Sequence, residues 1–113
     1  MTLILGFTAV LLASGSANSQ QKADSLRQLL EKTADPVVRA SVLKQLTRVS
    51  FESGDYVATI QYLNQEVSTH LTNRDSVSWS NAQYSLGMVY SVVRNFEEAA
   101  RHGLLAKDFF EKS

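Results

Sequence analysis

The two histidines, His70 and His102, are the side chains of this sequence best suited to metal or acid–base chemistry. Glu98 precedes His102 by four residues, so a helix would place both side chains on one face, where they could bind a metal ion. No second pair of ligands accompanies them. The residues therefore favour a simple ion pair or hydrogen bond. A metal-binding or enzymatic protein that uses Glu98 and His102 is the alternative.

The sequence contains no recognisable catalytic motif, because a G-x-S-x-G turn, a phosphate-binding glycine loop and a metalloprotease helix are all missing. It also has no cysteine, which excludes disulfides, thiolate catalysis and cysteine-based zinc sites. Asp35, Asp55 and Asp75 stand where helices are expected to begin, and capping explains them. We expect a protein that is not an enzyme and that binds no cofactor or metal.

The composition is that of a folded helical protein without a strong overall electric field. Eleven basic residues balance eleven acidic ones, so the net charge does not favour nucleic acid or an anionic membrane. A single proline and five glycines favour long helices over many short strands.

Residues 1–19 predict a secretory signal peptide. Leu3 to Ala13 are almost wholly apolar, and small and polar residues follow from Ser14 to Ser19. The apolar run is shorter than the roughly 20 residues needed to span a bilayer, so we expect no transmembrane helix in the mature chain. No lysine or arginine precedes the run, and a cytoplasmic protein with a misassigned start is the alternative. We expect cleavage after Ser19 and export to the periplasm or cell envelope.

Apolar periodicity predicts five helices and no strand in the remaining chain. They are expected at residues 24–33, 36–52, 56–71, 76–93 and 96–111. Asp35 and Pro36 suit the cap and the first position of the second helix, and Gly54 follows its end. In the last helix, the residues expected to face inward are Ala99, Ala100, Gly103, Leu104 and Phe110.

The last four helices form an internal repeat at an offset of forty residues. The offset aligns Leu46 with Leu86, Val49 with Val89, Tyr56 with Phe96, and the turn at Gly54 with the turn at Arg94. An internal repeat of this period indicates stacked helix hairpins.

The second unit resembles the tetratricopeptide repeat (TPR) family, whose pattern contains L-G-x-x-Y followed by alanine. The matching residues are Leu86, Gly87, Tyr90, Phe96, Ala99 and Ala106, with Leu46, Gly54 and Tyr56 in the first unit. Gly87 and Ala99 are small where the two helices would cross closely. Gly103 stands where the family has phenylalanine and Gln83 where it has tryptophan, so the unit is a divergent one.

The expected fold is all-α: antiparallel helix hairpins stacked as a short, TPR-like right-handed solenoid, with a HEAT-like α-solenoid as the alternative. The expected parts are a signal peptide (1–19), an N-terminal capping helix (20–35) and two TPR-like helix pairs (36–75 and 76–113). The family's usual period is about 34 residues, and we expect the excess to lie between the units, around residues 71–78. Solenoids usually need about three or more repeats, so we expect a longer array or self-association at the C-terminal end.

In TPR-like arrays the first helix of each unit lines a groove that takes an extended peptide or a partner helix. The residues on the matching face are Lys44, Arg48 and Phe51 in the first unit, and Asn81, Tyr84, Met88 and Val92 in the second. Lys44 and Arg48 are one helical turn apart and could pair with a partner carboxylate. Tyr84 and Met88 offer adaptable apolar contact. The alternative is that the two cations are only solvated and that Tyr84 and Met88 pack within the protein.

These features together predict a non-catalytic module that binds a protein or peptide. The signal peptide, the segment from Gln20 to Leu30 and the long-period repeats resemble the exported sensor region of bacterial signalling proteins that carry a histidine kinase or a DNA-binding output domain. That resemblance implies an extracytoplasmic sensing or scaffolding role. A cytosolic TPR adaptor and a small envelope metal-binding or enzymatic protein are the alternatives.

Overall fold

The computed structural model describes residues 19–112, and all regular structure in that part of the chain is helical. Residues 19–32, here the N-terminal helix, are followed by α2 (Pro36–Glu52), α3 (Tyr56–Thr72), α4 (Ser76–Val92) and α5 (Phe96–Lys112). The N-terminal helix thus includes residues before the predicted start at Asp24. Apart from Ser19, the predicted signal peptide lies outside the described residues.

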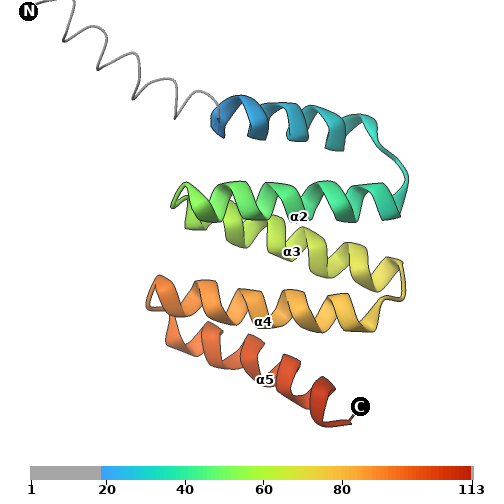
Figure 1. Ribbon diagram of the computed structural model, residues 1–113. Helices are drawn as coiled ribbons and strands as arrows, with labels where there is room; N and C mark the ends of the chain where they lie inside the picture. The colour runs from blue at the N-terminus through green and yellow to red at the C-terminus, as the bar shows by residue number, and fades with distance from the viewer. Residues whose placement is uncertain (1–18, 113) are drawn as a thin grey trace, which may run out of the picture.

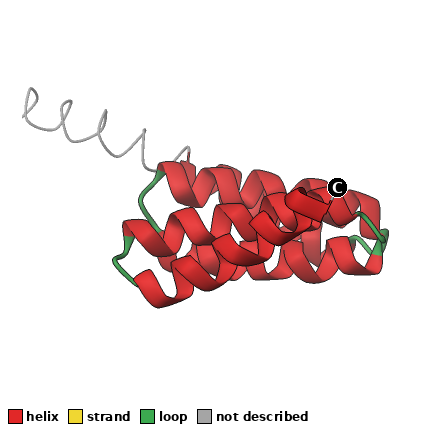
Figure 2. Cartoon of the chain, turned by 90° about the horizontal axis from the view of Figure 1, so that it is seen from below, coloured by secondary structure: helices red, strands yellow, loops and turns green. Residues whose placement is uncertain are grey.

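The helices form one stack in chain order, each running antiparallel to the next (Figure 1). α2 packs on α3, α3 on α4 and α4 on α5. The connections gather at the two ends of the helices, which leaves the long sides of the stack to helical surface (Figure 2). The predicted all-α stack of antiparallel helices is confirmed. No helix within residues 19–112 has the length and apolar character needed to cross a membrane.

The forty-residue repeat arises from the length of the helices. α2, α3, α4 and α5 each contain 17 residues. The connections at residues 53–55, 73–75 and 93–95 contain three residues each. The prediction that the excess over a period of about 34 residues lies around residues 71–78 is therefore wrong. The connection between the hairpins is as short as the turns within them, and the added length is helical.

The three turns after α2, α3 and α4 share one hydrogen-bonding pattern. The middle residue of each has a positive φ: Gly54 (80°), Arg74 (56°) and Arg94 (64°). The N–H of the third residue donates to the carbonyl five residues earlier at 2.9 Å, and its side chain accepts from an N–H in the first turn of the next helix. This geometry joins a Schellman C-cap to an aspartate or asparagine N-cap. Including the cap of α2, the capping residues recur every twenty residues: Asp35, Asp55, Asp75 and Asn95.

The connection between the N-terminal helix and α2 is built differently. None of residues 33–35 has a positive φ. The Arg39 guanidinium donates to the carbonyls of Leu30 at 2.7 Å and of Thr33 at 3.0 Å, so a side chain satisfies the end of the N-terminal helix. Asp35 caps α2 by accepting from the Val37 N–H at 2.9 Å. The predicted cap at Asp35 is confirmed.

Near the middle of each described helix lies a buried residue, and these central residues also recur at intervals of twenty. They are Leu26, Leu46, Glu66, Leu86 and Ala106. Apolar neighbours gather around them, Val42 beside Leu26 and Leu46, and Leu63 and Val89 beside Leu86. The core is therefore a narrow stripe that runs the length of the stack, and Glu66 is its one charged member.

The predicted inward face of α5 is partly wrong. Leu104 and Phe110 are 61% and 49% exposed, and Ala100 is exposed as well, whereas His102 and Ala106 are buried. The close crossing of α5 with α4 explains the difference. It turns the small residues of α5 toward α4, and the large apolar residues consequently face away from it.

That crossing is centred on two glycines. A Cβ added to Gly87 would lie 3.1 Å from the carbonyl oxygen of Ala99 and 3.3 Å from the amide nitrogen of Gly103. A Cβ added to Gly103 would meet nothing within 4 Å. The expectation that Gly87 and Ala99 lie at a close crossing is confirmed. The close approach therefore depends on the missing side chain of Gly87, and the side-chain position of Gly103 points away from the contact.

The two glycines predict opposite effects of the same substitution. Gly103→Ala is expected to raise the free energy of unfolding by about 0.5–1 kcal/mol, because alanine favours the helix and meets no neighbour. Gly87→Ala is expected to lower it, since the added methyl group pushes against the backbone of α5. Urea unfolding of both variants measures the difference. An equal gain in stability from both would contradict the close crossing.

The left-handed residue of the last turn predicts a stabilising change. Arg94→Gly is expected to raise the free energy of unfolding by up to about 1 kcal/mol, because glycine adopts a positive φ without the steric cost of a Cβ. Ala100→Gly, at an exposed position inside α5, is the control and is expected to destabilise the protein by about 1 kcal/mol. Thermal and urea unfolding report both changes. Loss of stability in Arg94→Gly would contradict the assigned turn.

Candidate functional site

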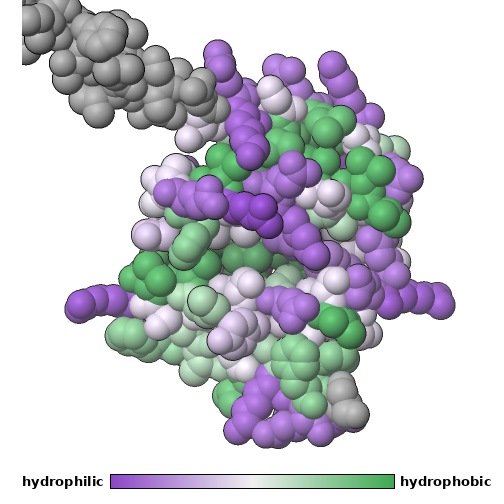
Figure 3. Space-filling view, viewed as in Figure 1, coloured by the Kyte–Doolittle hydropathy of each residue, from purple (hydrophilic) through white to green (hydrophobic). Residues whose placement is uncertain are grey.

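A groove of about 340 Å³ lies between α2 and α4, with α3 as its floor; we call it the α2–α4 groove. Lys44, Arg48 and Phe51 line it from α2, and Asn81 and Met88 line it from α4. The stack brings these two helices together across α3, although they are forty residues apart in the chain. On the face seen in Figure 3, apolar patches are separated by polar side chains.

Five of the seven residues predicted to form a partner-binding face therefore lie on one groove. Tyr84 lines an adjoining hollow between α4 and α5, which shares Asn81 with the groove. Val92 is half exposed and lines neither. Tyr84 and Met88 are 57% and 53% exposed, so packing within the protein does not account for them.

The walls of the groove differ in chemical character. Lys44 and Arg48 are exposed and form no ion pair with any described residue. The facing wall on α4 carries the neutral polar group of Asn81. Phe51 and Met88 add apolar surface. The groove thus offers two free cations, a hydrogen-bonding amide and an apolar surface to one ligand.

The floor of the groove contains a carboxyl group that the sequence analysis did not identify. Glu66 is only 4% exposed, and its Oε2 accepts a hydrogen bond from the Thr47 hydroxyl at 2.8 Å. Burial raises the pKa of Glu66 above its ordinary value, while the Thr47 hydrogen bond and the charge of Lys44 act in the opposite direction. The twenty-residue spacing of the sequence could have identified this residue as buried, because position 66 lies midway between Leu46 of α2 and Leu86 of α4.

His70 lies one helical turn beyond Glu66 and is also buried. Its Nε2 is 3.7 Å from Glu66 Oε1 and has no hydrogen-bond partner among the described residues. Burial lowers the pKa of His70, and the positive charge of Lys44 lowers it further, while Asp75 acts in the opposite direction. Glu66 on the groove floor therefore has a buried, incompletely hydrogen-bonded neighbour in His70, which lines the adjacent hollow near Arg74 and Asp75.

His102 has a different environment, because protein groups approach both of its ring nitrogens. Nδ1 lies 2.5 Å from Gln83 Oε1, and Nε2 lies 3.0 Å from the Arg101 guanidinium. Since guanidinium groups only donate, Nε2 accepts and Nδ1 carries the proton. Burial and the charge of Arg101 lower the pKa of His102, and the Tyr90 ring stacks on it at 5.4 Å.

The expected contact between Glu98 and His102 is present, but it is the weaker of the two contacts that Glu98 makes. The main partner of Glu98 is Arg101, at 2.7 Å, and its oxygen lies 3.5 Å from His102 Nε2. No group of three or more histidine, aspartate or glutamate side chains is placed to hold a metal ion within residues 19–112. Gln83, where the TPR pattern has tryptophan, supplies the partner of His102.

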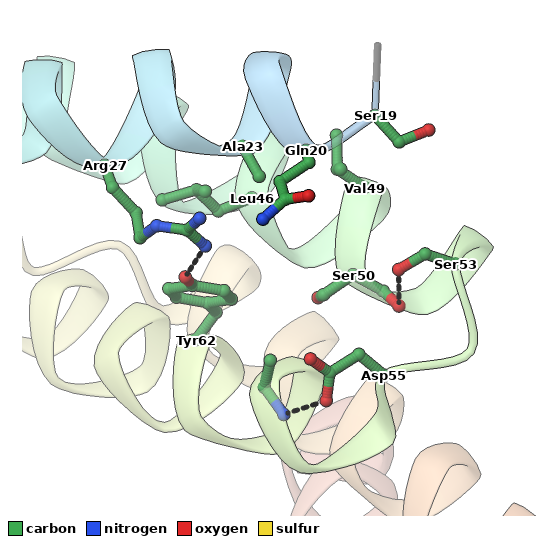
Figure 4. Close-up of a pocket in the computed structure, with 11 residues that line it drawn as sticks. Ser19, Gln20, Ala23, Arg27, Leu46, Val49, Ser50, Ser53, Asp55 and Tyr62 are labelled. Carbon is green, nitrogen blue, oxygen red and sulfur yellow. Dashed lines mark hydrogen bonds between the residues drawn. The ribbon is translucent and has the colours of Figure 1, made fainter. Parts of the chain in front are cut away.

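A second cleft, of about 580 Å³, separates the N-terminal helix from α2 and α3. Figure 4 shows that the side chains of Arg27, Ser53 and Asp55 form hydrogen bonds within the protein. Arg27 donates to the Tyr62 hydroxyl at 3.3 Å and thereby links the N-terminal helix to α3. Asp55 accepts from the Ala58 N–H at 3.1 Å and caps α3. These groups support the fold, so the α2–α4 groove is the stronger candidate for binding.

Glu66→Gln is expected to make the stability of the protein less dependent on pH. Because folding raises the pKa of Glu66, the stabilisation from this group is present below its ordinary pKa of 4.5 and is lost as the pH rises through the folded value. Glutamine keeps the size and the Thr47 hydrogen bond. The variant is therefore expected to gain stability over the native protein between pH 4 and pH 8, by on the order of 1 kcal/mol.

Urea unfolding at several pH values measures this difference. Glu52→Gln removes an exposed carboxyl group from α2 and serves as the control. A stability difference between Glu66→Gln and the native protein that stays constant from pH 4 to pH 8 would contradict the raised pKa.

Comparisons of this chain with protein-family models, with curated proteins and with solved structures find no significant match.

Proposed function

We propose that this protein is a non-catalytic helical repeat module that binds an extended peptide segment of a partner protein in the α2–α4 groove. The observation that carries the proposal is the convergence of two unpaired cations and an apolar surface, from helices far apart in the chain, on one groove. Its volume of about 340 Å³ falls within the roughly 300–1,000 Å³ typical of ligand sites.

The chemistry of the walls defines the class of peptide. Lys44 and Arg48 favour a carboxylate, and the guanidinium can bind it through two parallel hydrogen bonds. Phe51 and Met88 favour an apolar side chain next to that carboxylate, since methionine adapts its shape to irregular ligands. Asn81 can hydrogen-bond a peptide backbone group. The proposed ligand is therefore an extended segment that alternates acidic and apolar residues.

The proposed biological setting follows from the resemblance to TPR proteins. In that setting the chain is exported and serves as a sensing or scaffolding part of a bacterial envelope signalling protein. The exposed Leu104 and Phe110 on α5 support further contacts at the C-terminal end, either with additional repeats or with a second copy. A partner held by such an array would make contacts along several helices.

Peptide binding is the direct test of the groove. The probe is an acetylated octapeptide of alternating leucine and glutamate, and its counterpart replaces every glutamate by glutamine. We expect the acidic peptide to bind at least tenfold more tightly than its counterpart, and to shift the amide NMR signals of residues along the groove. Isothermal titration calorimetry gives the affinities.

A charge reversal identifies the residues responsible. Lys44→Glu with Arg48→Glu is expected to weaken binding of the acidic peptide by at least tenfold, because both proposed carboxylate contacts become repulsive. Lys22→Glu with Lys32→Glu, on exposed positions of the N-terminal helix, makes the same change in net charge and is expected to retain binding. Equal loss in both double variants, or signal shifts elsewhere on the protein, would contradict the proposal.

A further inference from the structure

We propose that the α2–α4 groove binds a carboxylate ligand together with one proton, which the Glu66–His70 pair beneath the groove takes up. This inference rests on the proposed peptide-binding function and adds a coupled proton to it.

The first observation is the position of Glu66. It occupies the central buried position of α3, the position at which the neighbouring helices α2 and α4 have Leu46 and Leu86. The side chain is 4% exposed and nevertheless lines the groove. Only one of its two oxygen atoms has a hydrogen-bond donor, the hydroxyl of Thr47. An ionised carboxylate in such a place is costly unless a proton or a counterion compensates it.

The second observation is the unpaired nitrogen of His70. Nε2 is shielded from solvent and has no hydrogen-bond partner in the described chain, and it lies 3.7 Å from the free Oε1 of Glu66. When the neutral ring carries its hydrogen on Nδ1, one further proton allows a hydrogen bond between Nε2 and Oε1. A protonated Glu66 can donate to Nε2, and a protonated His70 can donate to Oε1. In either form, one hydrogen bond gives a partner to the buried Nε2 of His70 and to the second carboxyl oxygen of Glu66.

The charges around the pair determine when the proton is bound. On α2, the Lys44 ammonium acts on both groups and Arg48 lines the same groove. At the other end, Arg74 and Asp75 lie in the hollow that contains His70. The α4 wall of the groove carries no charged side chain. Lys44 is therefore the cation that both Glu66 and a bound carboxylate would use.

A ligand carboxylate changes this balance. Once it pairs with Lys44 and Arg48, it neutralises the cation that stabilises ionised Glu66 and brings a second negative charge close to it. Both effects favour protonation of the Glu66–His70 pair. By linkage, protons must then strengthen binding of the ligand.

The experiment is calorimetric titration with the acetylated leucine–glutamate octapeptide at pH 6, 7 and 8, in phosphate and in Tris at the two higher values. The buffers differ in ionisation enthalpy, so the difference in binding heat counts the protons taken up. We expect an uptake approaching one proton, and an affinity that rises by roughly tenfold for each pH unit of acidification where the coupling is complete.

Three variants assign the proton. Glu66→Gln is expected to abolish uptake and to bind the peptide at pH 8 more tightly than the native protein. His70→Gln, expected to reduce uptake, gives a second measurement if Glu66→Gln does not fold. His102→Asn changes the other buried histidine, which lies outside the groove, and is expected to retain the full uptake.

The outcomes separate this inference from the function on which it rests. Peptide binding without proton uptake, or uptake that persists in Glu66→Gln, would overturn the coupling and leave the groove function intact. Loss of proton uptake in His102→Asn would assign the proton to His102 and would also overturn the coupling. Absence of binding at both pH 6 and pH 8 would overturn the groove function together with the coupling.

Discussion

A single-file stack of helices requires each helix to present its buried stripe to both of its neighbours. Here that requirement is met by a twenty-residue register, in which helices of 17 residues alternate with three-residue turns. Because the helices are equally long and the turns are equally long, the buried residue recurs at the same position in each helix. The positive φ at Gly54, Arg74 and Arg94 maintains this geometry, because it ends each helix and directs the chain back along it.

The second hairpin shows how departures from a repeat pattern can compensate one another. On α5 the backbone of Gly103 lies against Gly87 of α4, whereas the side-chain position of Gly103 faces open space. With α5 in this orientation, His102 lies in the interior, where the side-chain oxygen of Gln83 accepts a hydrogen bond from its Nδ1–H. A tryptophan at position 83 would leave His102 without that acceptor. Gln83, which departs from the family pattern, is therefore the residue that pairs with His102 at this crossing.

The polar interior of α3 has a different meaning. α3 is the helix that joins the two hairpins, since it packs against both α2 and α4. An aliphatic side chain at position 66 would extend the apolar stripe without interruption, as Leu46 and Leu86 do. The carboxyl group there interrupts the core beneath the groove. Local departures from good packing are typical of functional positions, and this one lies beneath Lys44 and Arg48.

By itself, the sequence determined the helices and their order. Asp35, Gly54 and Asp55 are local signals that act through the backbone of their immediate neighbours, so the limits of α2 and the start of α3 were predicted correctly. The forty-residue offset likewise predicted stacked hairpins. The twenty-residue recurrence of the capping residues was present in the sequence and would have shown that no long connection separates the units.

Only the tertiary structure decided which side of a helix is buried at positions where an apolar residue is exposed or a polar residue is buried. In α5 the apolar residues Leu104 and Phe110 look inward by periodicity, but the backbone contact at Gly87 and Gly103 turns them outward. Glu66 and His70 look like surface residues by type, but packing from both sides buries them. Periodicity describes one helix at a time, whereas burial depends on how closely its two neighbours approach.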